Sequence, residues 1–107
     1  MTHFGEYLRS LRKMENLTLT EFGARIGVDS ANLSKIENGK RDFDSKKLIR
    51  LSRSFNIDIE ILKEEFYSEL IAKKILENNC NIEVLDKARD KYNYLLYKKQ
   101  KQTQLEF

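Results

Sequence analysis

Few side chains in this 107-residue chain are of the types that catalyse reactions or hold metals. There is one histidine, His3, and one cysteine, Cys80. A single thiolate forms no disulfide within the chain and completes no closed tetrahedral metal site. We expect Cys80 to pack half-buried in a turn between two helices, in a reducing, intracellular setting. With no nucleophile–base pair, phosphate loop or metal-ligand spacing, the sequence predicts no enzyme, no metal site and no cofactor.

Charge indicates a different chemistry, the attraction of a polyanion. Residues 1–58 hold 11 lysines and arginines against 8 aspartates and glutamates, whereas residues 59–107 hold 9 of each. The whole net charge of +3 therefore lies in the N-terminal part. A basic face there would attract nucleic acid, although randomly scattered surface charge would give the same count.

The composition predicts an all-α fold. Hydrophobic residues make up 40% of the chain and charged residues 35%, with four glycines and no proline. This apolar share is too high for a disordered chain, and β-sandwiches and barrels need more Gly and Pro in their turns. No apolar run approaches the roughly 20 residues of a membrane-spanning helix, and the N-terminus does not resemble a signal peptide. We therefore expect a soluble, cytoplasmic protein with no membrane partner.

Helix starts recur along the chain in one local pattern. A cap residue follows one apolar residue and stands four positions before another, which is a hydrophobic staple around an N-cap. The caps are Thr18, Asp29, Asp44, Asp58 and, more loosely, Asn81. Together with Asn and Gly stops, the pattern predicts helices at about residues 4–15, 19–26, 30–37, 45–55, 59–77 and 82–99.

These helices suggest two parts. We expect a compact bundle of about five helices, with a first domain over residues 1–62. Residues 63–107 are expected to form a C-terminal helical extension, made of the long fifth helix and the sixth. The polar end of the chain, from about residue 98, is expected to fray.

The helices at residues 19–26 and 30–37 are joined by a tight turn. Gly27 is expected to take a positive φ there, and Gly23 to stand where the helices approach too closely for a side chain. Apolar residues fall on the faces that would pack together, namely Phe22, Ile26, Val28, Leu33 and Ile36. A helix-turn-helix needs all of these features at once.

This segment resembles the Cro/phage-repressor-type (XRE) helix-turn-helix regulators, over roughly residues 4–62. The likeness includes the Thr18–Glu21 capping box, the spacing of the two glycines and the run IENGKR at residues 36–41. It extends to positions in the flanking helices, namely Leu8, Leu11, Arg12, Leu48, Leu51, Phe55 and Ile57. Two positions depart from the family pattern: Leu19 stands where many members have a DNA-contacting Gln, and Phe43 where many have Pro.

The resemblance implies that the chain binds double-stranded DNA with the helix at residues 30–37 in the major groove. The positions that match base-reading residues of the family are Ser30, Ala31, Asn32, Ser34 and Lys35. Phosphate contacts map to Thr18, Asn38, Lys40 and Arg41. Arg12 and Glu37 match an ion pair between the first and third helices that holds the fold.

The C-terminal extension carries apolar stripes that two helices cannot both bury alone. We expect Phe66, Leu70, Tyr92 and Leu95 to form a two-fold interface between two copies of the chain, because tyrosine suits interfaces. The alternative is that these helices pack on their own bundle.

Together these features predict a sequence-specific transcriptional regulator that binds operator half-sites as a homodimer. Two alternatives use the same domain: the antitoxin of a toxin–antitoxin pair, with a toxin as protein partner, and a restriction–modification controller protein. A third is a protein–protein adaptor that has lost DNA binding, which Leu19 favours.

Overall fold

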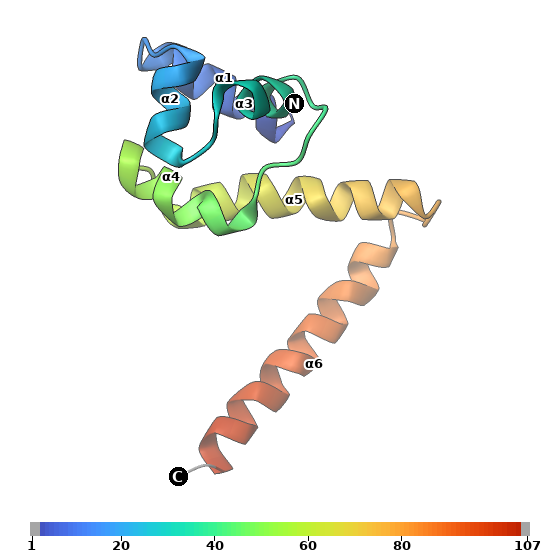
Figure 1. The fold of residues 1–107 in the computed structure, drawn as a ribbon. Helices are drawn as coiled ribbons and strands as arrows, with labels where there is room; N and C mark the ends of the chain where they lie inside the picture. The colour runs from blue at the N-terminus through green and yellow to red at the C-terminus, as the bar shows by residue number, and fades with distance from the viewer. Residues whose placement is uncertain (1–2, 106–107) are drawn as a thin grey trace. The chain divides into compact units, whose positions relative to one another are not determined.

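The computed structural model describes residues 3–105, which form six α-helices, one short 3-10 helix and no strand (Figure 1). The all-α prediction is therefore confirmed. The helices are α1 (Phe4–Met14), α2 (Leu19–Ile26), α3 (Ser30–Glu37), η1 (Ser45–Lys47), α4 (Leu48–Phe55), α5 (Ile59–Glu77) and α6 (Val84–Leu105). None of them is long and apolar enough to cross a membrane within the part of the chain that is described.

Side-chain caps start α2, α3 and α5 where the sequence predicts them. Thr18 and Glu21 form the expected capping box at α2, with each side chain bonded to the other residue's backbone N–H. Asp29 caps α3 by accepting from the N–H of Asn32 at 2.8 Å. Asp58 accepts from the N–H of Glu60 at 2.9 Å at the start of α5. Cap chemistry is local, which is why the sequence shows it.

Four local expectations are wrong. The helix expected at residues 45–55 begins as η1, because the N–H of Lys47 bonds back three residues to the carbonyl of Asp44. The last helix begins at Val84, after a turn in which Asn81 accepts from the N–H of Glu83. It then continues to Leu105 instead of fraying from about residue 98, since no Gly or Pro stops it and its Lys and Gln residues favour helix. Cys80 is exposed, not half-buried.

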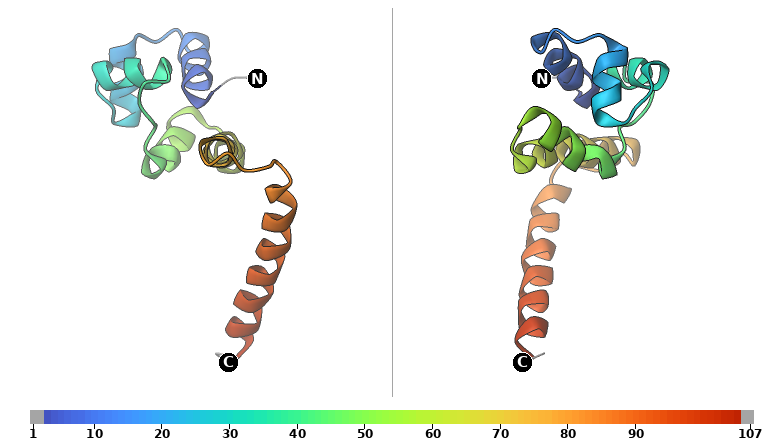
Figure 2. Two further views of the ribbon diagram at one scale, coloured as in Figure 1. Left: turned by 90° about the vertical axis from the view of Figure 1, so that its right-hand side faces the viewer. Right: turned by 60° about the vertical axis from the view of Figure 1, so that its left-hand side comes forward.

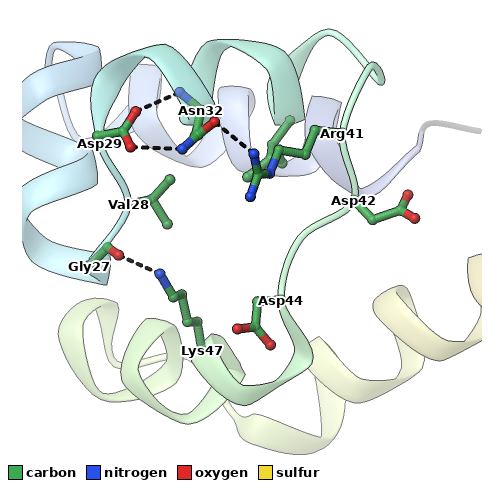
Figure 3. A pocket seen from close by; sticks show the side chains of 9 residues that line it. Gly27, Val28, Asp29, Asn32, Arg41, Asp42, Asp44 and Lys47 are labelled. Atoms are coloured by element: carbon green, nitrogen blue, oxygen red, sulfur yellow. Dashed lines mark hydrogen bonds between the residues drawn. The ribbon is translucent and has the colours of Figure 1, made fainter.

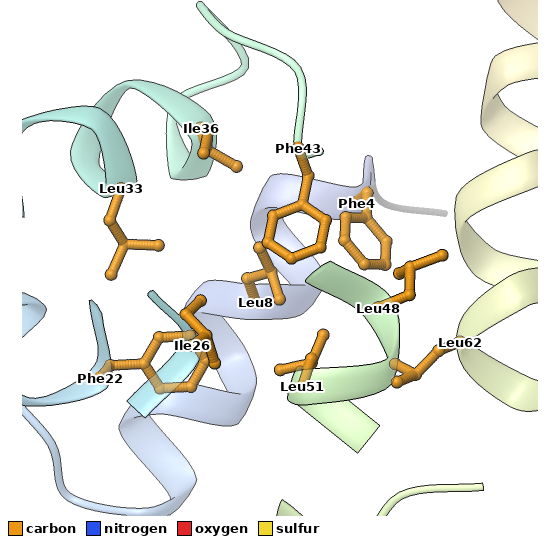
Figure 4. Packing of buried hydrophobic residues seen from close by; sticks show 10 residues of the cluster. All are labelled: Phe4, Leu8, Phe22, Ile26, Leu33, Ile36, Phe43, Leu48, Leu51 and Leu62. Atoms are coloured by element: carbon orange, nitrogen blue, oxygen red, sulfur yellow. The ribbon is translucent and has the colours of Figure 1, made fainter. Parts of the chain in front are cut away.

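Ten buried apolar side chains form the core of the N-terminal part (Figure 4). They come from α1 to α5 and from the loop before η1, and they are Phe4, Leu8, Phe22, Ile26, Leu33, Ile36, Phe43, Leu48, Leu51 and Leu62. Phe43 packs its ring against that of Phe4, with centroids 5.3 Å apart. Phe43 therefore contributes an aromatic side chain to the core.

The chain divides into two compact units, one ending at Ile71 and the other beginning at Ala72. In the first unit, α1, α2 and α3 lie together on one side of α4 (Figure 2). The predicted boundary at residue 62 falls inside α5, and the residues beyond it still pack on the first unit. Phe66 meets Phe4 edge to face at 5.4 Å, and Glu69 accepts from the N–H of Phe4 at 3.1 Å.

The turn between α2 and α3 depends on two glycines. Gly27 ends α2 with a φ of +76°, as predicted, which glycine adopts without strain. A methyl group on Gly23 would collide with the carbonyl oxygen of Val28. The close approach expected at Gly23 is therefore to the turn that leads into α3, and it lets α2 and α3 share one core.

Candidate nucleic-acid interface

Helix α3 has one buried face and one free face. Leu33, Ile36 and Glu37 are buried against the rest of the first unit. The predicted base-reading residues lie on the other face, where Ser30, Ala31 and Lys35 are exposed and Asn32 and Ser34 are half-buried. The fold thus presents all five residues along the accessible side of a short, well-anchored helix.

A buried carboxylate ties α3 to α1. The Oε2 atom of Glu37 lies 2.8 Å from Nε of Arg12, and Oε1 accepts from Nη2 of Arg12 at 2.9 Å. Arg12 also donates to the carbonyl oxygen of Leu17 at 3.1 Å. The hydrogen bond to Glu37 raises the pKa of Arg12 above its ordinary value, so this guanidinium stays charged. The structure thus brings together the two residues expected to pair.

Arg9 is a third member of this cluster that sequence reasoning missed. Its Nε atom lies 3.3 Å from Oε1 of Glu37, and its Nη2 atom donates to Oδ1 of Asn38. The signal was present in the sequence, because Arg9 and Arg12 are three residues apart and share a face of α1. Two arginines therefore fix the C-terminal end of α3.

Asn38, a predicted phosphate-binding residue, is exposed but takes part in the same network. Besides accepting from Arg9, its side chain donates from Nδ2 to the carbonyl oxygen of Ser34 at 2.9 Å. Its side-chain amide therefore closes the last turn of α3. Lys40 and Arg41 follow on the loop between α3 and η1, with exposed side chains.

Thr18 lies at the first turn of α2, the other place where phosphate contacts are expected. Its hydroxyl oxygen accepts from the N–H of Glu21 at 3.1 Å, which leaves the hydroxyl proton available to an outside acceptor. The backbone N–H of Thr18 lowers the pKa of Glu21 by donating to its carboxylate. Leu19 is half-buried and packs against the core, so the residue that replaces the family's Gln stabilises the fold.

Cations near α2 cap its C-terminal end, a feature that sequence reasoning also missed. Arg50 of α4 donates to the carbonyl oxygens of Arg25 at 2.9 Å and Ala24 at 3.0 Å. Lys47 donates to the carbonyl oxygen of Gly27. Positive side chains suit the negative end of a helix, and these bonds hold α4 against the helix-turn-helix.

Asp29, Asn32 and Arg41 form a second network at the start of α3, beside a hollow next to α3 (Figure 3). Asn32 donates from Nδ2 to Oδ2 of Asp29 at 2.7 Å and accepts at Oδ1 from Nη1 of Arg41 at 2.9 Å. The N–H of Asn32 lowers the pKa of Asp29 below its ordinary value, and the charge of Arg41 adds to the effect. Asp29 thus caps the helix, as expected, and also orients a predicted base reader.

The lowered pKa of Asp29 predicts an acid-sensitive contribution to stability. A carboxyl whose pKa is lower in the folded state stabilises the fold above its unfolded pKa of about 3.9, and this contribution is lost as the pH falls through the lower folded value. We expect the difference in unfolding free energy between the wild type and Asp29→Asn to be constant above about pH 5 and to shrink below about pH 4. Urea titrations from pH 7 to 2.5 measure it, and a difference that stays constant to the acid end contradicts this assignment.

Comparisons with known proteins agree with this architecture. The model of the Helix-turn-helix family matches residues 8–62. The chain is 32% identical to the HTH-type transcriptional repressor RghR of Bacillus subtilis over 105 residues, which are 94% of this chain and 78% of that protein. No solved structure matches the chain.

Two shorter similarities concern a phage protein and an antitoxin. The ImmF control region 10 kDa protein of Bacillus phage phi105 is 34% identical over 59 residues, 55% of this chain and 66% of that protein. Antitoxin PezA of Streptococcus pneumoniae is 31% identical over 62 residues, 57% of this chain and 39% of that protein. The chain belongs to the Cro/phage-repressor-type (XRE) family of helix-turn-helix DNA-binding transcriptional regulators, which are not enzymes.

Proposed function

We propose that this chain is a sequence-specific regulator that binds operator half-sites as a homodimer, with α3 in the major groove. The observation that carries the proposal is the two-sidedness of α3, whose accessible face holds Ser30, Ala31 and Lys35. Its other face is fixed by the core and by Glu37. A rigid helix with a free polar face suits the dimensions of the major groove. The similarity to a repressor over 94% of the chain supports transcriptional repression. We propose that the protein acts in the cytoplasm.

The side chains on α3 suggest how bases are read. Lys35 donates to the guanine acceptors O6 and N7, and the methyl group of Ala31 suits the methyl group of thymine. Asn32 has the donor and acceptor that pair with adenine. Ser30 and Ser34 add hydroxyl groups that bond to either kind of partner.

Phosphate contacts come from both sides of α3. Thr18 offers a hydroxyl proton, while Lys40 and Arg41 offer charges on the following loop. Asn38 lies between them at the end of α3. Contacts of this kind set the register of the protein on the duplex and make binding dependent on salt.

Dimerisation is proposed through the C-terminal helices. Tyr92 and Leu95 are 61% and 63% exposed on α6, and Leu70 of α5 is also exposed. Tyr92 and Leu95 follow Leu85 and Ala88 on α6 at alternating spacings of three and four residues. This spacing is typical of a helix that packs against another helix. Phe66, the fourth residue predicted for the interface, packs instead on Phe4 of its own unit, so the proposed interface rests on the other three.

A second candidate function is favoured by the similarity to PezA, whose name describes it as an antitoxin. In this case the exposed apolar face of α6 would bind a toxin and not a second copy of this chain. Expressing the full chain with its neighbouring genes distinguishes the two. A homodimer that binds DNA without another protein supports the regulator, and a stable complex with a small toxin supports the antitoxin.

Selection of bound duplexes from a random DNA pool tests the proposed function, and two lysines then test the placement of α3. We expect Lys35→Ala to change the preference at one base pair by about 1–3 kcal/mol. Lys40→Ala is expected to weaken binding to all duplexes equally and to reduce the slope of log K against log salt by about 1. Fluorescence anisotropy with single-base-pair variants measures both. If Lys35→Ala leaves every preference unchanged in a folded protein, α3 is not the recognition helix.

A further inference from the structure

The side-chain amide of Asn32 is held from two directions by residues outside α3 (Figure 3). Asp29, in the turn before the helix, accepts from Nδ2 at 2.7 Å, and Arg41, in the loop after it, donates to Oδ1 at 2.9 Å. Asp29 is itself fixed, because its other carboxylate oxygen accepts from the backbone N–H of Asn32 at 2.8 Å. Two hydrogen bonds therefore set the orientation of this amide, and a third fixes Asp29.

We propose that Asp29 and Arg41 are positioning residues that hold the Asn32 amide ready to read one adenine–thymine base pair. The amide has two donor hydrogens and two acceptor lone pairs. The bonds to Asp29 and Arg41 use one of each. One donor and one acceptor remain, and they match N7 and the N6 amino group of adenine. This inference rests on the proposed placement of α3 in the major groove.

Arg41 links this base reading to the DNA backbone. A guanidinium has five N–H donors, so the bond from Nη1 to Asn32 leaves others for a phosphate oxygen. The positive charge of Arg41 also offsets the negative charge of the Asp29 carboxylate, which would otherwise repel the phosphate backbone of the DNA. An amide that is already oriented loses less conformational entropy when it binds. Arg41 thus has two roles, as a phosphate contact and as the residue that orients Asn32.

The first test uses the full-length protein without DNA. Asp29 and Arg41 together are called the clamp on Asn32. Arg41→Ala removes one side of the clamp, and Asp29→Ser removes the other while keeping a cap acceptor for the first turn of α3. Lys40→Ala is the matched control, since it removes the neighbouring exposed cation of the same loop. We expect the NMR order parameter of the Asn32 side-chain NH2 group to fall in both clamp variants and to stay at the wild-type value in Lys40→Ala. Equal values in all four proteins overturn the clamp.

The second test measures base discrimination, as the ratio of the Kd values of the best selected duplex and its single-base-pair variants. We expect Asn32→Ala to lose roughly 10- to 100-fold of discrimination at one base pair. Arg41→Ala should lower the ratio at that same pair by about threefold or more, and should lower it no further in the Asn32→Ala background. Lys40→Ala should weaken binding without changing the ratio.

The outcomes separate the inference from the proposed function. If Arg41→Ala and Lys40→Ala both leave the ratio unchanged while the chain still selects duplexes, the positioning role is wrong and the DNA-binding function stands. If the chain selects no duplex, the proposed function fails and the base-reading role fails with it. A loss of Asn32 order in the clamp variants would then show only that the clamp is structural.

Discussion

Replacing Arg12 with methionine is expected to lower the free energy of unfolding by about 3 kcal/mol, at the lower end of what breaking a buried ion pair costs. The side chain of Glu37 is only 2% exposed, so its carboxylate cannot be rehydrated when its main partner is lost. The contact with Arg9 remains at 3.3 Å and limits the cost. Domains of this size are stable by only about 5–15 kcal/mol, so the change is large. Urea unfolding followed by circular dichroism measures it.

Two further variants show whether the loss of stability comes from the Glu37 carboxylate left without Arg12. Arg9→Met is the matched control, because the side chain of Arg9 is 36% exposed against 15% for Arg12, and we expect it to cost at most about 1 kcal/mol. The double variant Arg12→Met with Glu37→Leu removes both charges and should recover much of the loss, as replacing whole buried pairs by apolar residues often does. Equal costs for Arg9→Met and Arg12→Met would show that Glu37 does not depend on Arg12.

The first unit could be predicted largely from sequence because its signals are local. Thr18, Asp29 and Asp58 cap helices through bonds to residues two or three positions away, and Gly27 marks the turn by its own backbone conformation. Such interactions need no knowledge of the rest of the fold. The helix-turn-helix resemblance added the order in which these elements pack.

The tertiary contacts that escaped prediction join residues that are not neighbours in sequence. The packing of Phe66 on Phe4 joins positions 62 residues apart, and a stripe of apolar residues does not say whether it faces the same chain or another. The bond from Arg41 to Asn32 depends on the path of the loop after α3. Arg50 caps α2 from 25 residues away. In each case the residue type allowed several partners, and only the tertiary structure selects one.

The largest effect on DNA affinity is expected from disrupting the proposed dimer with Tyr92→Lys and Leu95→Lys together. Two lysines on the exposed apolar face of α6 would have to be buried in the interface, so the full-length protein should become monomeric. A monomer loses the effective concentration that joins two half-site readers. We therefore expect the affinity for an operator with two half-sites to fall by about 10²–10⁴-fold, while the affinity for a single half-site does not fall. Sedimentation and anisotropy measure these quantities.

The same helix provides a control of the same chemistry. Tyr94 and Tyr97 are as exposed as Tyr92 and Leu95 but lie two residues further along α6, which places them on the opposite face of the helix. Tyr94→Lys with Tyr97→Lys adds the same charge, so it should leave a dimer that binds both half-sites. If this pair disrupts assembly as strongly as the first, the effect is one of net charge and not of the interface. A wild-type chain that sediments as a monomer at tens of micromolar overturns the dimer itself, because operator binding by two copies would then need contacts made only on DNA.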